Sequence, residues 1–170
     1  MKVGIFIENM FNTQEFMYPY YRLQEEGIEP VVIGPEVDTY VAEHIAYRHD
    51  ADVAARDVDP DELAGLIIPG GYAPDRIRRH QSMLDIVRAI DAARKPLGSI
   101  CHASWVIISA RVVRGRRLTA VASTRDDLEN AGAIYLDERV VVDGNLVTAQ
   151  SYPDAPAFTK AFLDVLRSMD

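Results

Sequence analysis

The feature that most constrains the fold of this chain is an alternation of short apolar runs with longer segments of helical periodicity. Apolar runs of strand length occupy residues 2–8, 29–34, 63–71 and 96–100. Apolar residues recur at helical spacing in residues 13–27, 81–95, 102–113 and 154–169. Strands that alternate with helices of about ten to fifteen residues are typical of βαβ units, in which helices cover both faces of a parallel sheet. The sequence therefore predicts an α/β fold, a three-layer sandwich with a mostly parallel sheet in the middle.

The remaining segments complete this prediction. Residues 36–60 are polar and lack both patterns, and we expect a small antiparallel hairpin excursion there. Residues 118–123 and 124–132 continue the alternation with a strand and a helix. Two apolar runs in residues 139–149 flank an Asp-Gly-Asn turn, which predicts a β-hairpin. Since no internal repeat or linker divides the sequence, we expect residues 1–170 to form a single domain.

The composition limits the partners that we expect. The formal net charge is −8, which argues against a nucleic-acid partner because phosphate binding depends on basic surface. We interpret the basic clusters at residues 75–80 and 111–117 as solvated surface or a subunit contact. The one cysteine cannot form an internal disulfide, which favours a reducing compartment. No run approaches the roughly 20 apolar residues of a membrane span, and the N-terminal run lacks the length of a signal peptide. We therefore expect a cytoplasmic protein with no membrane partner.

The single cysteine lies where a predicted strand passes into a predicted helix. Cys101 follows residues 96–100 and precedes residues 102–113. Ligands of parallel sheets bind beyond the carboxyl ends of the strands, and the N–H groups at a helix N-terminus stabilise a thiolate. A nucleophile on a sharp strand-to-helix turn has the arrangement of a nucleophile elbow, although the G-x-S-x-G signature is absent. Position alone leaves two interpretations open, a nucleophile or a small buried apolar residue.

Two neighbouring features favour the nucleophile. Because successive helical residues do not face each other, His102 could contact Cys101 only if Cys101 has a strained, non-helical backbone, which an elbow supplies. The Gly70-Gly71 turn also ends a predicted strand and should reach the same edge of the sheet. Its backbone N–H groups, together with one at residues 101–102, could form an oxyanion hole.

Two acidic residues are further candidates. Asp75 follows Gly71 by four residues and could orient a histidine, or could serve only as a helix cap. Glu15 lies early in the helix predicted for residues 13–27. It could act as an acid or share a proton with a thiolate, or it could simply pair with the helix dipole. We expect neither a metal nor a cofactor, because the other histidines show no ligand spacing with the cysteine: His44, His49 and His80.

Taken together, these residues resemble the ThiJ/PfpI superfamily, most closely its PfpI-type intracellular protease branch. The resemblance covers essentially the whole chain and is carried by LIIPGGYAPDRIR, KPLGSICH, ISARVVRGRRLTA, DDLENAGA and VVVDGNLVTAQ. It implies a flavodoxin-like sandwich with Cys101 as the nucleophile, His102 as its partner and Glu15 near the thiol. In this branch an acidic residue at the position of Asp75 reaches the histidine of a neighbouring subunit. The resemblance therefore implies a homodimer or hexamer whose active site lies at a subunit interface.

The sequence departs from the family pattern around the expected pocket. The family usually has Gly-Pro or a similar pair after the histidine, where this chain has Ala103 and Ser104, and Gln150 replaces a frequent arginine. A larger residue at position 103 could narrow the pocket and Ser104 would add a hydroxyl group. We expect the pocket to be lined by Tyr72, Ala103, Ser104 and Trp105.

The family activities that the resemblance implies are weak peptidase action, glyoxalase III-type conversion and deglycation. We expect a cysteine-dependent hydrolase or lyase in which the Cys101 thiolate adds to a small carbonyl or acyl substrate. Two alternatives stay open. One is a dedicated biosynthetic hydratase or lyase of the isonitrile hydratase type, and the other is a non-catalytic, redox-sensing stress chaperone. A glutamine amidotransferase is excluded, because that class needs a distant histidine and none follows His102.

Overall fold

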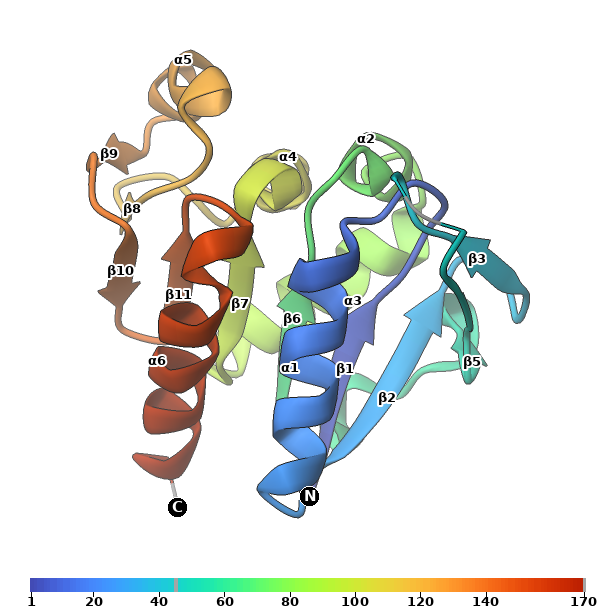
Figure 1. The fold of residues 1–170 in the computed structure, drawn as a ribbon. Coiled ribbons are helices and arrows are strands. Elements are labelled where there is room, and N and C mark those ends of the chain that lie inside the picture. Colours follow the sequence, from blue (N-terminus) through green and yellow to red (C-terminus); the bar gives the residue numbers. More distant parts are fainter. Residues whose placement is uncertain (45, 170) are drawn as a thin grey trace.

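The computed structural model of the chain describes residues 1–44 and 46–169. Ile45, within the predicted excursion 36–60, and Asp170, at the end of the predicted unit 1–170, lie outside the described residues. In the part that is described, a seven-stranded sheet forms the middle layer (Figure 1). Its strands, in spatial order, are β10 (Val140–Asp143), β11 (Leu146–Ala149), β7 (Leu97–Ile100), β6 (Gly65–Ile68), β1 (Lys2–Phe6), β2 (Glu29–Gly34) and β5 (Val53–Ala54).

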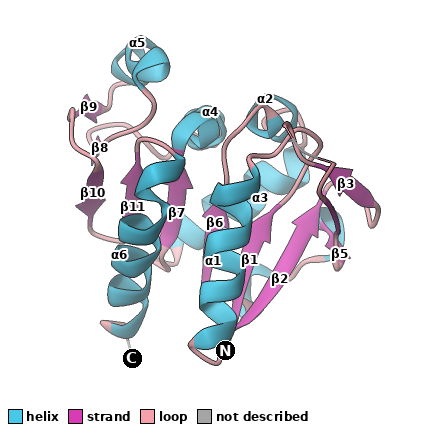
Figure 2. Ribbon diagram, viewed as in Figure 1, coloured by secondary structure: helices cyan, strands magenta, loops and turns pink. Residues whose placement is uncertain are grey.

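Helices cover both faces of this sheet. The long helices α1 (Thr13–Glu25) and α6 (Ala155–Arg167) lie side by side on one face, and α3 (Gln81–Ala92) lies on the other (Figures 1 and 2). Neighbouring strands pair parallel, except that β10 runs antiparallel to β11. The α/β sandwich that the alternation predicted is therefore confirmed.

The central strands carry apolar side chains on both faces, as a sheet between two helical layers requires. All residues of β6, β7 and β11 are buried. Helix α6 turns Phe158 and Phe162 toward the sheet, and both rings are fully buried. The four strands β1, β6, β7 and β11 run parallel, so their carboxyl ends lie at the same edge of the sheet. The short helices α2 (Ala73–Ile77) and α4 (Ser104–Ser109) lie close to this edge (Figure 1).

The two predicted antiparallel features are present. Within residues 36–60, β3 (Thr39–Val41) pairs antiparallel with β4 (Arg48–Asp50). The hairpin predicted for residues 139–149 is formed by β10 and β11, and β11 also pairs parallel with β7. No helix among residues 1–44 and 46–169 is long and apolar enough to cross a membrane.

Several predicted bounds are wrong. The strand predicted for residues 118–123 is reduced to β8 (Arg117–Leu118), which pairs with β9 (Ile134–Tyr135) and is followed by α5 (Arg125–Asn130). The helix predicted for residues 102–113 is a 3₁₀ turn followed by α4, which ends before Arg111 adopts a left-handed φ of 63°. The described 3₁₀ turns are η1 (Ala55–Asp57), η2 (Pro60–Glu62), η3 (Cys101–Ala103), η4 (Ala122–Thr124) and η5 (Tyr152–Asp154).

Candidate active site

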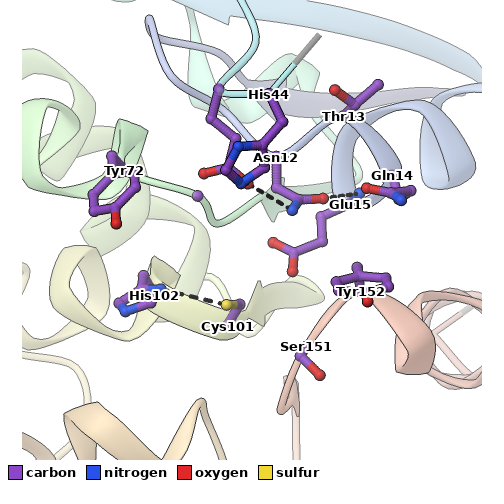
Figure 3. A pocket seen from close by; sticks show the side chains of 12 residues that line it. Asn12, Thr13, Gln14, Glu15, His44, Tyr72, Cys101, His102, Ser151 and Tyr152 are labelled. Carbon is purple, nitrogen blue, oxygen red and sulfur yellow. Dashed lines mark hydrogen bonds and ion pairs between the residues drawn. The ribbon is translucent and has the colours of Figure 1, made fainter.

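Cys101 has the strained backbone that the sequence predicted for it. It follows β7 directly and has φ 60°, a left-handed conformation that L-residues other than glycine rarely adopt. The 3₁₀ turn η3 begins at this residue, so the chain passes from strand to helical turn with no residue between them. As a result the Cys101 Sγ and the His102 Nδ1 lie 3.4 Å apart, although the two residues are adjacent in sequence (Figure 3). The strand-to-helix joint is therefore an elbow.

The Gly70-Gly71 turn closes around the elbow from the end of β6. A Cβ atom on Gly70 would lie 2.5 Å from the Glu15 Oε2 and 2.8 Å from the Cys101 Cβ, so only glycine fits there. Gly71 has φ 78°, and its backbone N–H, with that of His102, interacts with the thiol and lowers its pKa. The Gly70 N–H instead donates to the Glu15 Oε2 at 2.7 Å. The Gly70 N–H is thus engaged by Glu15, whereas the Gly71 N–H faces the Cys101 sulfur, and the oxyanion role of the two glycines stays a prediction.

Glu15 is fully buried beside the thiol. It occupies the first turn of α1, where its backbone N–H donates to the capping Asn12 Oδ1 at 3.1 Å. Its side chain does not complete the cap but turns inward, and its Oε1 has no hydrogen-bond partner among the described residues (Figure 3). Burial raises the pKa of Glu15 to about 7, and the negative charge of Glu43 adds to this, while the Gly70 N–H and the Cys101 thiol oppose it. A carboxyl group with this pKa still carries its proton in a large fraction of molecules at neutral pH.

The environment of Cys101 opposes the thiolate that the N–H groups of the following helix were expected to stabilise. Burial is the largest effect and the negative charge of Glu15 the next, and together they raise the pKa of Cys101 to about 12. The backbone N–H groups of His102 and Gly71 act in the opposite direction. Since the charge of Glu15 is one of the causes, a proton on Glu15 removes part of the obstacle to a thiolate. The ionisations of the two groups are therefore coupled, since a charge on Glu15 makes a thiolate at Cys101 less favourable.

His102 completes the group at the elbow. Its Nε2 lies 3.4 Å from the Ser123 Oγ, and its ring packs between Tyr72 and Trp105, with centroids 6.4 Å and 5.0 Å away. Burial lowers the pKa of His102, so the imidazole is neutral at pH 7 and able to accept a proton. Asp75 lies exposed on α2 and is not among the residues that share this site within the chain. The prediction that Asp75 orients the histidine of a neighbouring subunit stays a prediction.

These side chains open into a pocket of about 660 Å³ beyond the carboxyl ends of β1, β6, β7 and β11 (Figure 3). Its lining residues are Asn12, Thr13, Gln14, Glu15, Glu43, His44, Gly71, Tyr72, Cys101, His102, Ser151 and Tyr152. Among the described residues, no three His, Cys, Asp or Glu side chains are arranged to hold a metal ion.

Three of the four predicted pocket residues lie elsewhere. The elbow directs Ala103 and Ser104 into the core, where both are buried and the Ser104 Oγ donates to the Thr124 Oγ1 at 3.0 Å. Trp105 lies beyond the ring of His102 and donates its Nε1–H to Asp127 at 3.0 Å. Only Tyr72 lines the pocket as predicted.

The sequence interpretation missed the opposite wall of the pocket. Asn12 follows β1, Ser151 and Tyr152 follow β11, and Glu43 with His44 comes from the segment after β3. The position of Ser151 just past a central parallel strand was a usable signal. For Glu43 the sequence contained no such signal. The Asn12 Nδ2 donates to the Glu43 Oε1 at 2.8 Å, and these two residues are 31 positions apart in the sequence.

A family model described as the DJ-1/PfpI family matches residues 1–165. The chain belongs to the DJ-1/PfpI family. Over 167 residues it is 37% identical to Deglycase PfpI from Pyrococcus furiosus, covering 98% of this chain and 100% of that protein. It is 38% identical to a deglycase from Thermococcus kodakarensis with the same coverage. The resemblance inferred from the motifs is thereby confirmed, and deglycases are among its relatives.

Solved structures of the DJ-1/PfpI family have the same fold. A two-domain protein from Anabaena variabilis, with dj-1/thij/pfpi-like and ferritin-like domains, superposes with a TM-score of 0.96 at 35% identity. The match covers 98% of this chain and 50% of that protein, so this chain spans half its length. Drosophila melanogaster DJ-1beta superposes with a TM-score of 0.89 at 22% identity, covering 97% of this chain and 90% of that one.

Proposed function

We propose that this DJ-1/PfpI protein is a cysteine-dependent enzyme that acts on a small carbonyl or acyl compound, with deglycase-like chemistry as the favoured reaction. The observation that carries the proposal is the elbow. Cys101 is held in a left-handed conformation with His102 Nδ1 3.4 Å from its sulfur and the buried Glu15 beside it. A purely structural cysteine needs neither a strained backbone nor a buried carboxyl group next to it. The names of the deglycase relatives support the same class of activity.

The proposed reaction begins with the thiol. The thiol proton passes to the neutral His102 Nδ1, and the sulfur forms a C–S bond with the carbonyl carbon. The π electrons of the carbonyl group move to its oxygen, which the Gly71 N–H stabilises and which takes a proton from Glu15.

In an acyl substrate the carbonyl carbon carries an amine. The adduct oxygen then returns its proton to Glu15 as the C=O bond re-forms, the C–N bond breaks and the amine departs with the proton held by His102, which leaves a thioester that water hydrolyses. With methylglyoxal the adduct is a hemithioacetal, and transfer of a proton from its carbon to the neighbouring carbonyl carbon gives the thioester of lactate without an outside oxidant. With an amine adduct of methylglyoxal, the sulfur replaces the amine and gives the same hemithioacetal.

We also propose that residues 1–170 act as one domain and that the site is completed in an oligomer. The match to only the DJ-1-like half of a two-domain protein supports the first inference. The second rests on the exposed position of Asp75, which leaves its carboxylate available to another subunit.

The test of the catalytic role is turnover of methylglyoxal and of its amine adducts by Cys101→Ser. We expect kcat/KM to fall by at least about 100-fold, because the serine hydroxyl is a far weaker nucleophile at neutral pH. Ser168→Ala, an exposed change at the end of α6, should leave kcat/KM unchanged. Full turnover by Cys101→Ser would refute the proposal.

A redox sensor is the second candidate, and Glu15 is the observation that favours it. A protonated Glu15 whose Oε1 lacks a partner would donate a hydrogen bond to a Cys101 sulfinate. This candidate predicts that mild peroxide adds two oxygen atoms at Cys101 and that no carbonyl compound is turned over. The hydratase alternative loses its motivation, because Ala103 and Ser104 are buried and do not shape the pocket.

A further inference from the structure

The wall of the pocket combines acidic side chains with no permanent cation. Of the described residues that line it, Glu15 and Glu43 are acidic and none is lysine or arginine. The two histidines are the other ionisable groups on the wall besides the thiol and the tyrosines. Burial keeps His102 neutral at pH 7, and the side chain of His44 is 77% exposed to water. The field inside the pocket is therefore negative.

Glu43 is the main fixed source of this field. Its side chain is only 6% exposed, and it lines the same pocket as Cys101, with its Oε2 beside Gly71. Its backbone N–H donates to the Phe11 carbonyl at 3.0 Å, and its Oε1 accepts from the Asn12 Nδ2 at 2.8 Å. Neither contact supplies a positive charge, and the one ion pair it forms among the described residues is with the exposed His44.

The charge of Glu43 acts on the two side chains that flank Cys101. It contributes to the raised pKa of Glu15, and in His102 it opposes the lowering of the pKa that burial causes. A carboxylate on a bound substrate would be repelled by the carboxylate of Glu43. At short distance from a carboxylate as buried as that of Glu43, such repulsion weakens binding by about tenfold or more.

We propose that Glu43 makes this pocket select uncharged or cationic electrophiles and reject those that carry a carboxylate beside the reacting carbon. For the proposed enzyme, on which this assignment rests, the site then favours carbonyl compounds that have no carboxylate next to the reacting carbon. Small 2-oxo acids are excluded. Glu43 acts on selectivity through its charge and takes no part in bond formation.

The charge selectivity can be measured without any turnover, because Cys101 is the only thiol. Iodoacetamide and iodoacetate alkylate a thiolate by the same step: the sulfur bonds to the methylene carbon, the C–I bond breaks and iodide leaves with the electron pair. The two reagents differ in charge. At low salt and pH 8, we expect iodoacetate to react at least about tenfold more slowly than iodoacetamide, after division by the same ratio for a small free thiol.

Variants at position 43 test whether Glu43 causes the preference for iodoacetamide over iodoacetate. Glu43→Gln should reduce the preference for iodoacetamide by about five- to tenfold, and Glu43→Asp should retain it. Glu138→Gln, an exposed charge change away from the pocket, should leave it unaltered. Equal normalised rates in the unmodified protein, or an unchanged ratio in Glu43→Gln, would overturn the proposal. If Glu43→Gln fails to fold, the ratio in the unmodified protein and in Glu43→Asp decides it.

The same variants connect the inference to catalysis. We expect kcat/KM for glyoxylate, relative to methylglyoxal, to rise by about tenfold in Glu43→Gln, mainly through KM. Absence of any aldehyde turnover would refute the proposed function but leave the alkylation ratio decisive for the role of Glu43. Normal methylglyoxal turnover with an unselective alkylation ratio would refute only the role of Glu43.

Discussion

At the scale of single residues, ionisation of the buried Glu15 lowers the stability of the folded protein. Burial raises its pKa from 4.5 to about 7, so the folded state holds its proton more tightly than the unfolded chain does. The stabilisation that protonated Glu15 adds to the free energy of unfolding is fully present below pH 4.5 and is lost as the pH rises through about 7. The site thus keeps a buried acid whose ionisation weakens the protein in the pH range where the thiol has to react.

Replacement of Glu15 by glutamine should reveal this conflict. Since glutamine does not ionise, Glu15→Gln should gain about 2 kcal/mol of unfolding free energy relative to the unmodified protein between pH 5 and pH 8. Urea denaturation at the two pH values measures it. Glu25→Gln, an exposed change on the same helix, should track the unmodified protein at both. An equal difference at pH 5 and pH 8 would contradict the raised pKa.

The coupling between Glu15 and Cys101 also predicts how the reactivity of Cys101 depends on pH. The first proton leaves the Glu15–Cys101 pair near pH 7, and one of the two resulting forms is a thiolate hydrogen-bonded to a protonated Glu15. The iodoacetamide rate should therefore rise near pH 7, level off, and rise again toward pH 12, where the thiol loses its proton beside a charged Glu15. In Glu15→Gln the lower rise should vanish and one rise below pH 12 should remain. A single inflection at the same pH in both proteins would count against this coupling.

At the scale of elements, the elbow between β7 and α4 stores strain at its first residue. Cys101 has φ 60°, a conformation that glycine adopts freely and alanine does not. Cys101→Gly should therefore be more stable than Cys101→Ala by about 1 kcal/mol, although both lack the thiol. Thermal or urea unfolding of the two variants compares them directly. If alanine were the more stable, the elbow would not be strained.

The same element shows what the sequence could and could not predict. The elbow was predictable, because Cys101 stands between an apolar strand and a helical segment, and a contact with His102 would require a non-helical backbone at that position. The length of α4 was not, since residues 102–113 keep an apolar helical pattern past its end at Ser109. Arg111 ends that pattern with a left-handed φ where no glycine or proline marks a stop. Local pattern predicts which element forms, whereas its end depends on packing.

The candidate site divides in the same way. Cys101 and His102 directly follow one predicted strand, and Glu15 lies early in the helix that follows another, so the common edge of a parallel sheet brought them together in the prediction. The contact between Asn12 and Glu43 depends on how the chain around β3 pairs with residues 10–12, beyond the end of β1, for which the sequence contains no local signal. Nucleophile chemistry was accordingly easier to predict than the charge of the pocket wall.

At the scale of the whole molecule, several large apolar side chains are exposed to solvent around the mouth of the pocket. Tyr72 and Tyr152 line the pocket and are 57% and 52% exposed, and Met10, whose carbonyl accepts from the Tyr72 N–H at 2.9 Å, is 38% exposed. Asp75 lies one helical turn from Tyr72 on α2. Large apolar side chains beside an exposed carboxylate suit a surface that a second subunit covers. This exposure supports the proposal that the site is completed across an interface.

A mixing experiment tests this shared site. Cys101→Ser and Asp75→Asn should each be inactive alone if Asp75 orients the histidine of a neighbouring subunit. When the two variants are mixed and allowed to exchange subunits, half of the pairs are mixed, and in each mixed pair one site combines an intact Cys101 with an intact Asp75. Activity should therefore recover to about a quarter of that of the unmodified protein, as pairwise symmetry requires. Mixing Cys101→Ser with Cys101→Ala is the matched control and should restore nothing. No recovery from the first mixture, with subunit exchange verified by mass, would mean that Asp75 serves its own subunit or none.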